Sequence, residues 1–141
     1  MIDVETQIFV AVMTGLIPTL ERMGVTAPER HVYNDYVEQP PVFPHVSIVE
    51  IDNATDRQRR STAPGEDYAA LTYEVNIYSN KQIGRKAECK ALAAAVDEIL
   101  LRLGFTRNSL ESVPNLLDAT IYRITGRYTA LVSRSETLYR R

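Results

Sequence analysis

The strongest constraint on the fold is the stretch from Tyr68 to Tyr78, in which apolar and polar side chains alternate strictly. Successive side chains of a β-strand point to opposite faces of the sheet, so this alternation places one set in a core and the other set outside it. The set predicted to face the core is Ala69, Leu71, Tyr73, Val75 and Ile77, and the opposite set is Thr72, Glu74 and Asn76. A chain with such a strand needs a second layer that covers one face of a sheet.

An alanine-rich helix follows this strand directly. Ser79 and Asn80 end the strand and offer an N-cap, and Gly104 ends the helix after about Leu103. Alanine has the highest intrinsic helix propensity, which favours a helix through the middle of the segment. The apolar face of this predicted helix consists of Ala87, Leu92, Ala95, Val96, Ile99 and Leu103.

Residues 3–23 predict another helix, at the start of the chain. Asp3 is expected to cap it and Gly24 to end it. An interior proline removes a backbone hydrogen bond, so Pro18, close after Gly15, predicts a bend or break near residues 15–18. The apolar residues recur at helical spacing and are Ile8, Phe9, Val12, Leu16, Ile17, Leu20 and Met23.

Three further segments have strand-like patterns, at 31–37, 45–51 and 118–132. The segment 52–67 is polar and carries Pro and Gly, so we predict a flexible loop there, across which strands 45–51 and 68–78 pair antiparallel. Together the elements predict an α+β (α/β) fold, with a single mixed, largely antiparallel sheet of three to four strands packed against two main helices.

The bulk composition limits the classes of function. The chain has 141 residues, which fits one domain over 1–141, and its net charge is −2 with a pI of about 5.7. Surfaces that bind nucleic acid over a wide area are usually basic, so this charge argues against that class. The start of the chain is acidic where a signal peptide is basic, and no apolar run approaches the ~20 residues of a membrane span. Cys89 is the single cysteine, so we expect no intrachain disulfide and synthesis in a reducing cytosol.

The reactive residue types do not form a catalytic or metal-binding pattern. His31 and His45 are fourteen residues apart in sequence, whereas metal sites need several ligands at usable spacing. Cys89 lies on or beside the apolar face of the alanine-rich helix, so we interpret it as a buried, inert thiol, and His45 as a packing or capping residue. The glycines are scattered singly, without a nucleophile elbow or phosphate-binding run. We therefore predict no catalytic residue, no cofactor and no metal, and a protein that is not an enzyme.

Two groups of residues are candidates for contacts with other proteins. Arg57, Arg59 and Arg60 cluster in the predicted loop, where they are either simply solvated or available to DNA phosphates or an acidic protein surface. Tyrosine is enriched at protein interfaces, and the tyrosines outside the clearest strands are the better candidates. These are Tyr33, Tyr36 and Tyr139, whereas Tyr73, Tyr78, Tyr122 and Tyr128 are expected to pack within the sheet.

Five short motifs occur in order between residues 43 and 131. They are Phe43-Pro44-His45-Val46, Tyr73-Glu74-Val75-Asn76-Ile77-Tyr78-Ser79-Asn80-Lys81, Leu103-Gly104-Phe105-Thr106, Val113-Pro114-Asn115 and Ala119-Thr120-Ile121-Tyr122-Arg123. In this order they resemble the tail terminator (tail completion) proteins of long-tailed bacteriophages. The resemblance does not extend to the first forty residues, to the segment 52–67 or to the last ten.

The resemblance implies a structural virion protein. Such proteins assemble as a hexameric ring on the head-proximal end of the finished tail tube, where the ring stops polymerisation and offers the surface that joins the head. The implied partners are other copies of the chain, the major tail tube protein and a head-closure or connector protein. DNA would pass through the lumen without specific binding, which the mild negative charge does not contradict. No membrane is implied, and the implied location is the host cytoplasm during assembly and then the virion tail.

Three alternatives stay open from the sequence. A head–tail connector or neck protein occupies a neighbouring ring of the same virion. A small cytosolic enzyme is favoured only if Cys89 or His45 is exposed and activated. A nucleic-acid-binding regulator would act through Arg57, Arg59 and Arg60.

Overall fold

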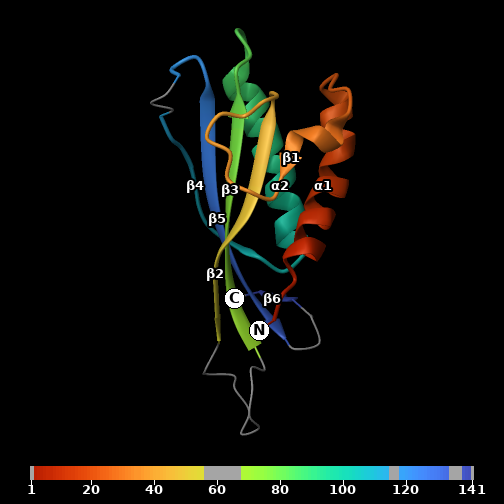
Figure 1. The fold of residues 1–141 in the computed structure, drawn as a ribbon, viewed down its shortest axis with the longest axis vertical. Helices are drawn as coiled ribbons and strands as arrows, with labels where there is room; N and C mark the ends of the chain where they lie inside the picture. Colours follow the sequence, from red (N-terminus) through yellow and green to blue (C-terminus); the bar gives the residue numbers. More distant parts are fainter. Residues whose placement is uncertain (1, 56–67, 115–117, 134–137, 141) are drawn as a thin grey trace, which may run out of the picture.

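A computed structural model describes residues 2–55, 68–114, 118–133 and 138–140 of the chain. Two long helices and one sheet account for most of these residues (Figure 1). The helices pack against each other and lie together on one face of the sheet. The segment that joins the first two strands crosses the upper part of the other face (Figure 1).

The first helix, α1, runs from Glu5 to Arg22 without a break. The break that was one of the two outcomes predicted at residues 15–18 does not occur, because burial of the apolar stripe outweighs the one backbone hydrogen bond that Pro18 cannot make. Asp3 is not the N-cap, which is Val4; the Asp3 carboxylate instead accepts a hydrogen bond from the N–H of Glu5 (3.1 Å). The buried stripe consists of Ile8, Val12, Leu16 and Leu20.

The second helix, α2 (Arg85–Arg102), begins later than predicted. Its N-cap is Gly84 and not Ser79 or Asn80, and a φ of +87° at Gly84 is a conformation that glycine adopts readily. The Ser79 hydroxyl donates instead to Oε1 of Glu88 (2.7 Å), which ties the end of the preceding strand to the first turn of the helix. The buried face of α2 consists of Cys89, Leu92, Ala93, Val96, Ile99 and Leu100.

In the described part of the chain the sheet has six strands. They are β1 (Val32–Tyr33), β2 (His45–Thr55), β3 (Tyr68–Ser79), β4 (Thr106–Ser112), β5 (Tyr122–Ser133) and β6 (Leu138–Arg140). The order across the sheet is β1-β2-β3-β5-β4, with β6 paired to β5 as well. β1 is parallel to β2 and the other pairs are antiparallel. The predicted fold class is confirmed, but three to four strands was too few.

Three boundaries differ from the sequence prediction. The strand expected at 31–37 is reduced to the two residues of β1, which follow a 3-10 turn over Pro28–His31 (η1). β2 continues to Thr55, into the segment predicted as a loop, because after a bulge between Glu50 and Asp52 its last residues pair with β3. The rest of the predicted loop, 56–67, lies outside the described residues. The final long strand begins at Tyr122 rather than at residue 118.

The alternation of β3 divides the sheet as predicted. Its apolar set is at most 1% exposed and forms the core together with the buried stripes of the two helices. On the opposite face, Thr72 and Glu74 are half-buried and Asn76 is only 1% exposed. The far face is therefore polar but not fully open to solvent.

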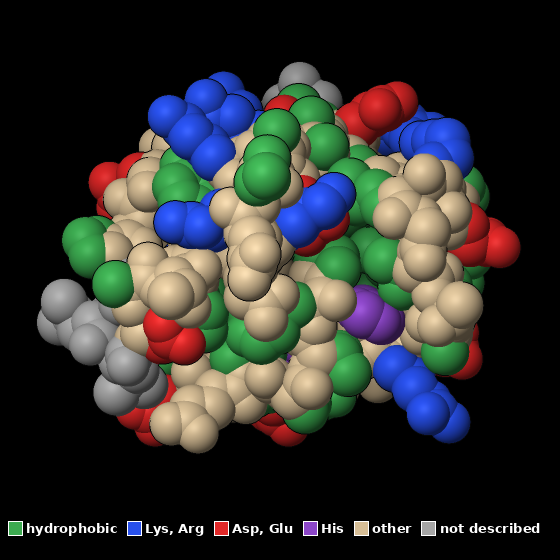
Figure 2. Space-filling model, turned by 90° about the horizontal axis from the view of Figure 1, so that it is seen from above, with side chains coloured by type: hydrophobic (Ala, Val, Ile, Leu, Met, Phe, Trp, Pro, Cys, Tyr) green, Lys and Arg blue, Asp and Glu red, His purple; other side chains and the backbone are tan. Residues whose placement is uncertain are grey.

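The connection between β3 and α2 and the start of α1 lie at opposite ends of the molecule. β3 passes into α2 at the upper end of Figure 1, and α1 begins at the lower end, near the last turn of α2. Figure 2 looks onto the upper end and shows Lys and Arg side chains spread over it, with hydrophobic side chains between them. Residues 80–84 form the connection between β3 and α2 at this end.

Candidate functional site

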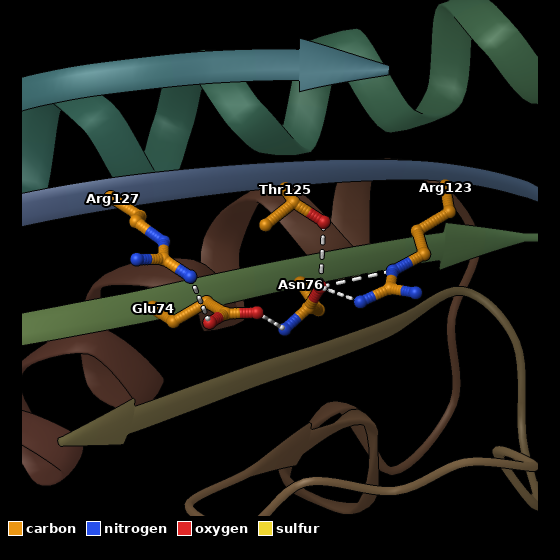
Figure 3. A network of polar contacts seen from close by, with 5 residues as sticks. All are labelled: Glu74, Asn76, Arg123, Thr125 and Arg127. Carbon is orange, nitrogen blue, oxygen red and sulfur yellow. Dashed lines mark hydrogen bonds and ion pairs between the residues drawn. The ribbon is translucent and has the colours of Figure 1, made fainter. Parts of the chain in front are cut away.

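Five polar side chains from β3 and β5 form a network on the face of the sheet opposite the helices (Figure 3). Its centre is Asn76, whose Oδ1 accepts hydrogen bonds from Nε and Nη2 of Arg123 (3.0 and 2.7 Å) and from the Thr125 hydroxyl (2.7 Å). The Asn76 amide donates to Glu74 (3.2 Å), and Glu74 pairs with Arg127 (3.5 Å). The register brings them together, because residue 76 is opposite 125 and residue 74 is opposite 127.

This network is suited to holding a surface in shape. The Thr125 hydroxyl donates to an amide oxygen, which is not a base, so the network does not activate it as a nucleophile. Arg123 also lies 5.5 Å from the centre of the Tyr78 ring, so its guanidinium is fixed by both hydrogen bonds and an aromatic face. Arg127 is more open, with 55% of its side chain exposed. The result is a rigid patch of hydrogen-bonding groups at the middle of the face.

His45 is buried at the upper end of the same face. Its ring lies between Tyr33 (centroids 4.6 Å apart) and Tyr78 (5.7 Å), and both ring nitrogens lack a hydrogen-bond partner among the described residues. Burial, with a smaller contribution from the charge of His31, lowers the pKa of His45 to about 4. The imidazole is therefore neutral near pH 7. The packing role predicted for His45 agrees with its complete burial.

Cys89 is fully buried in α2, as predicted. Its thiol lies 3.5 Å from the carbonyl oxygen of Tyr122 and 3.8 Å from that of Ile77, the distances of weak S–H hydrogen bonds. Burial, and then the neighbouring charge of Glu88, raises the pKa of the Cys89 thiol to about 12. The thiolate that a nucleophile needs is therefore disfavoured at neutral pH.

The residues predicted to contact other proteins do not form one described cluster. Tyr36 is 56% exposed, on the segment between β1 and β2. Tyr33 is half-buried against His45, so most of its ring serves packing within the chain. Tyr139 lies in β6, and its side chain is outside the described part. Arg57, Arg59 and Arg60 also lie outside the described residues. Their role at an interface stays a prediction.

Two surface grooves flank α2, and sequence reasoning found neither. One, of about 720 Å³, lies between α2 and the strands β4 and β5, with Ala94, Leu101 and Leu110 among its lining residues. The other, of about 700 Å³, lies between α1 and α2. At Gly15 an added Cβ would lie 2.6 Å from Cδ1 of Ile99, so the helices approach closely along this second groove. Helix–helix spacing of this kind is set by tertiary packing and leaves only a weak trace in sequence.

Within the described ranges, His, Cys, Asp and Glu do not gather in a group of three or more that could hold a metal ion. Among the same residues, neither helix has the length and apolar character needed to cross a membrane.

No protein-family model matches the chain, and neither does a curated protein. Nineteen solved chains match it, and a chain with the same fold is among them. That chain belongs to the virion of a native gene transfer agent particle and superposes with a TM-score of 0.59. The two sequences are 20% identical, and the match covers 88% of this chain and 92% of the other. The likeness therefore extends over nearly the whole of both chains, and at this identity it establishes the fold.

Proposed function

We propose that this chain is a structural protein of a phage-like virion and, more specifically, its tail terminator. In this role it forms a ring at the head-proximal end of the tail tube, ends tube polymerisation and offers the surface that joins the head. Its partners are other copies of itself, the major tail tube protein and a head-closure or connector protein.

The observation that carries the proposal is the fold shared with a chain from a gene transfer agent virion, which covers 92% of that chain. A match this complete means that the chain has the whole structural unit of the virion component, with little added. Fold alone does not fix function, because one fold can serve several roles. The tail-terminator motifs supply the narrower assignment.

The positions of these motifs support the narrower assignment. Two of them, residues 43–46 and 73–81, lie side by side, because His45 is opposite Tyr78 and Val46 is opposite Ile77. A third contributes Phe105, which is fully buried and makes an edge-to-face contact with Tyr73 (centroids 5.4 Å apart). Motifs that are distant in sequence thus meet in one packing unit. This is what a resemblance based on a shared fold requires.

Cys89 and His45 are the two residues that would favour an enzyme, and their surroundings argue against that alternative. Cys89 is buried with a raised pKa, and His45 is buried without a hydrogen-bonded partner that it could activate. The surface features nearest to a binding role are the two grooves that flank α2.

The test is to mix the purified protein with tail tubes that lack a terminator and to image the ends by electron microscopy. We expect binding at one end only, with a ring of roughly six subunits and arrested tube growth. Binding along the tube, binding at both ends or continued elongation would contradict the tail-terminator role. Binding to a head connector without any effect on the tube would assign the chain to the neck instead.

A further inference from the structure

A pocket of about 350 Å³ opens at the upper end of the molecule. Four segments that are distant in sequence converge on it: the chain just after α1, the turn η1, the last residues before β2, and the connection from β3 into α2. Its volume is at the lower end of the range of small-ligand sites. The pocket therefore suits one side chain, or a molecule of that size.

The pocket contains one hydrogen-bonding atom that is held in place and has no partner. His31 is only 8% exposed, and its Nδ1 lies 2.6 Å from the carbonyl oxygen of Pro44. A carbonyl oxygen can only accept, so Nδ1 is the donor, and in the neutral ring Nε2 is left as an acceptor. Within the described part of the chain, Nε2 has no hydrogen-bond partner and is not enclosed in the interior, so it opens into the pocket that the ring lines. Figure 2, which looks onto this end, shows a histidine side chain at the surface.

Lys81 and Glu88 add charge to the polar part of the lining. The Glu88 side chain is 12% exposed, and its Oε1 already accepts a hydrogen bond from Ser79 (2.7 Å). Nζ of Lys81 lies 3.9 Å from Oε2 of Glu88, and the lysine side chain is 60% exposed. An exposed ion pair of this length contributes little, so the ammonium can turn toward a ligand. The lining thus offers an acceptor on His31 and a donor on Lys81.

Apolar side chains form another part of the lining. Met23 and Val25, just after α1, are half-buried and pack against the core. Phe43 and Pro44 contribute from the segment before β2. A ring that packs against these side chains removes apolar surface from water. A matching ligand therefore has an apolar body and a polar group that both donates and accepts.

A phenol meets these requirements better than the other side-chain groups do. A carboxylate is repelled by Glu88 and has no proton for Nε2 of His31, whereas a guanidinium or ammonium is repelled by Lys81 and offers it no acceptor. A purely apolar side chain leaves Nε2 without a partner, and an amide brings little apolar surface. The hydroxyl of a phenol donates to His31 and accepts from Lys81, while its ring packs against the apolar part.

The surface beside the pocket indicates that the phenol belongs to a protein. Ile83, two residues after Lys81, is the most exposed large hydrophobic side chain in the described part of the chain, at 88%. Arg85 donates to the carbonyl oxygens of Lys81 and Gln82 (3.4 and 3.5 Å), which braces the turn that carries Ile83. An exposed isoleucine on a braced turn gains free energy when a partner protein covers it. Tyrosine is also one of the residues enriched at the centres of protein interfaces.

We propose that this pocket binds a tyrosine side chain of another protein, whose hydroxyl donates to Nε2 of His31 and accepts from Nζ of Lys81, and whose surroundings cover Ile83. The site goes beyond the proposed function, because it belongs to the folded chain whether or not the chain caps a tail tube. In a tail terminator, the tyrosine would come from a neighbouring virion protein.

The first experiment compares two probes on the purified protein. N-acetyl-tyrosinamide and N-acetyl-phenylalaninamide differ only in the hydroxyl, and binding of each is followed by NMR of the backbone amides. We expect the tyrosine probe to bind about two- to tenfold more tightly, which is the factor that one net hydrogen bond supplies. The amide signals of Gly24, Val25 and Lys81 should shift, because these residues line the pocket. Equal binding of the two probes, or shifts confined to another surface, would overturn the proposal.

Variants then test the two hydrogen-bonding groups. His31→Phe keeps an aromatic ring but removes the acceptor, so the preference for the tyrosine probe should disappear. His45→Phe is the same change at the histidine that does not line the pocket, and it should leave the preference unchanged. Thermal melting confirms that each variant is folded. Lys81→Met removes the donor from an exposed side chain and should reduce the preference, even if His31→Phe proves unstable. A preference that persists in every folded variant would show that the hydroxyl binds elsewhere, and the proposal would fail.

A third probe separates a protein tyrosine from a free phenol. p-Cresol has the same phenol without a peptide backbone. If p-cresol binds the pocket and N-acetyl-tyrosinamide does not, the pocket admits only small phenols and the protein partner is wrong. All of these measurements use the isolated chain, so their outcome is independent of the tail-terminator role. Capping of tail tubes without tyrosine binding would leave the function standing and remove the pocket, and the reverse result would leave the pocket standing.

Discussion

The two faces of the central sheet are stabilised by different kinds of interaction, although they share the same strands. On the helix-covered face, the alternate residues of β3 pack into the apolar core. On the far face, Asn76 is just as deeply buried, yet its surroundings are hydrogen-bond donors from β5. Apolar packing depends on volume and tolerates small shifts, whereas a buried amide needs each partner in position. The helix-covered face should therefore dominate stability, and the far face should dominate the shape of the exposed surface.

The largest effect on stability is expected from removing a large side chain from the core on the helix-covered face. Phe105→Ala should lower the free energy of unfolding by about 3–5 kcal/mol, because the ring is fully buried against Tyr73 and leaves a cavity. Urea unfolding followed by circular dichroism measures the change. Thr72→Ala, on the far face, is the control and should cost less than about 1 kcal/mol. Equal losses in the two variants would remove the contrast between the faces.

The next effect concerns pH and belongs to the far face. The pKa of His45 is about 4 in the folded protein and 6.5 in the unfolded chain, so the unfolded chain binds the proton first as pH falls. Stability should therefore be full above pH 6.5 and fall by about 1.4 kcal/mol per unit down to pH 4, a total of about 3 kcal/mol.

His45→Phe keeps an aromatic ring beside Tyr33 and Tyr78 and removes the titrating group. The difference in unfolding free energy between wild type and His45→Phe isolates the histidine from the carboxylates, which titrate in both proteins. That difference should change steadily between pH 6.5 and pH 4. A constant difference across this range would show that His45 keeps its ordinary pKa.

The difference between buried and exposed elements also explains which parts of the structure could be predicted from the sequence. The alternation of β3 and the helical stripe of α1 were predicted because both elements bury one face, and burial leaves a period in the sequence. β4 was missed because, as an edge strand, it is mostly exposed and does not alternate. The α2 cap was placed too early because Ser79 is a good capping residue, but its hydroxyl binds Glu88 instead.

The features of the candidate site were harder to predict from the sequence. The Asn76 network depends on the register between β3 and β5, which brings residue 76 opposite residue 125. A sequence gives the polar residues of each strand but not their cross-strand partners. The α1–α2 groove likewise depends on how closely Gly15 approaches Ile99. Ile83 was visible in the sequence, but only the structure shows that its side chain is left outside the core.

A smaller effect is expected from the centre of the polar network. Asn76→Ala should lower the free energy of unfolding by about 1–3 kcal/mol, because it leaves the donors of Arg123 and Thr125 without their shared acceptor. Thr125→Val removes a single hydrogen bond and should cost about 0.5–1.5 kcal/mol. Chemical denaturation of the three proteins gives both values. If Asn76→Ala proves neutral, water replaces the lost partner and the far face is less rigid than its geometry indicates.

The smallest effect is expected at the edge of that network. Arg127 is 55% exposed and its ion pair with Glu74 is long, at 3.5 Å, so water competes with the interaction. Exposed pairs of this kind contribute about 0–1 kcal/mol, and salt weakens them further. A double-mutant cycle with Arg127→Ala and Glu74→Gln should therefore give a coupling below about 1 kcal/mol that disappears at high salt. The glutamine keeps an oxygen that can accept from Asn76, so the cycle tests the ion pair and not the neighbouring hydrogen bond. A larger coupling that salt does not change would mean that Arg127 is held within the network as firmly as Arg123, and the rigid patch would then extend to the exposed edge of the face.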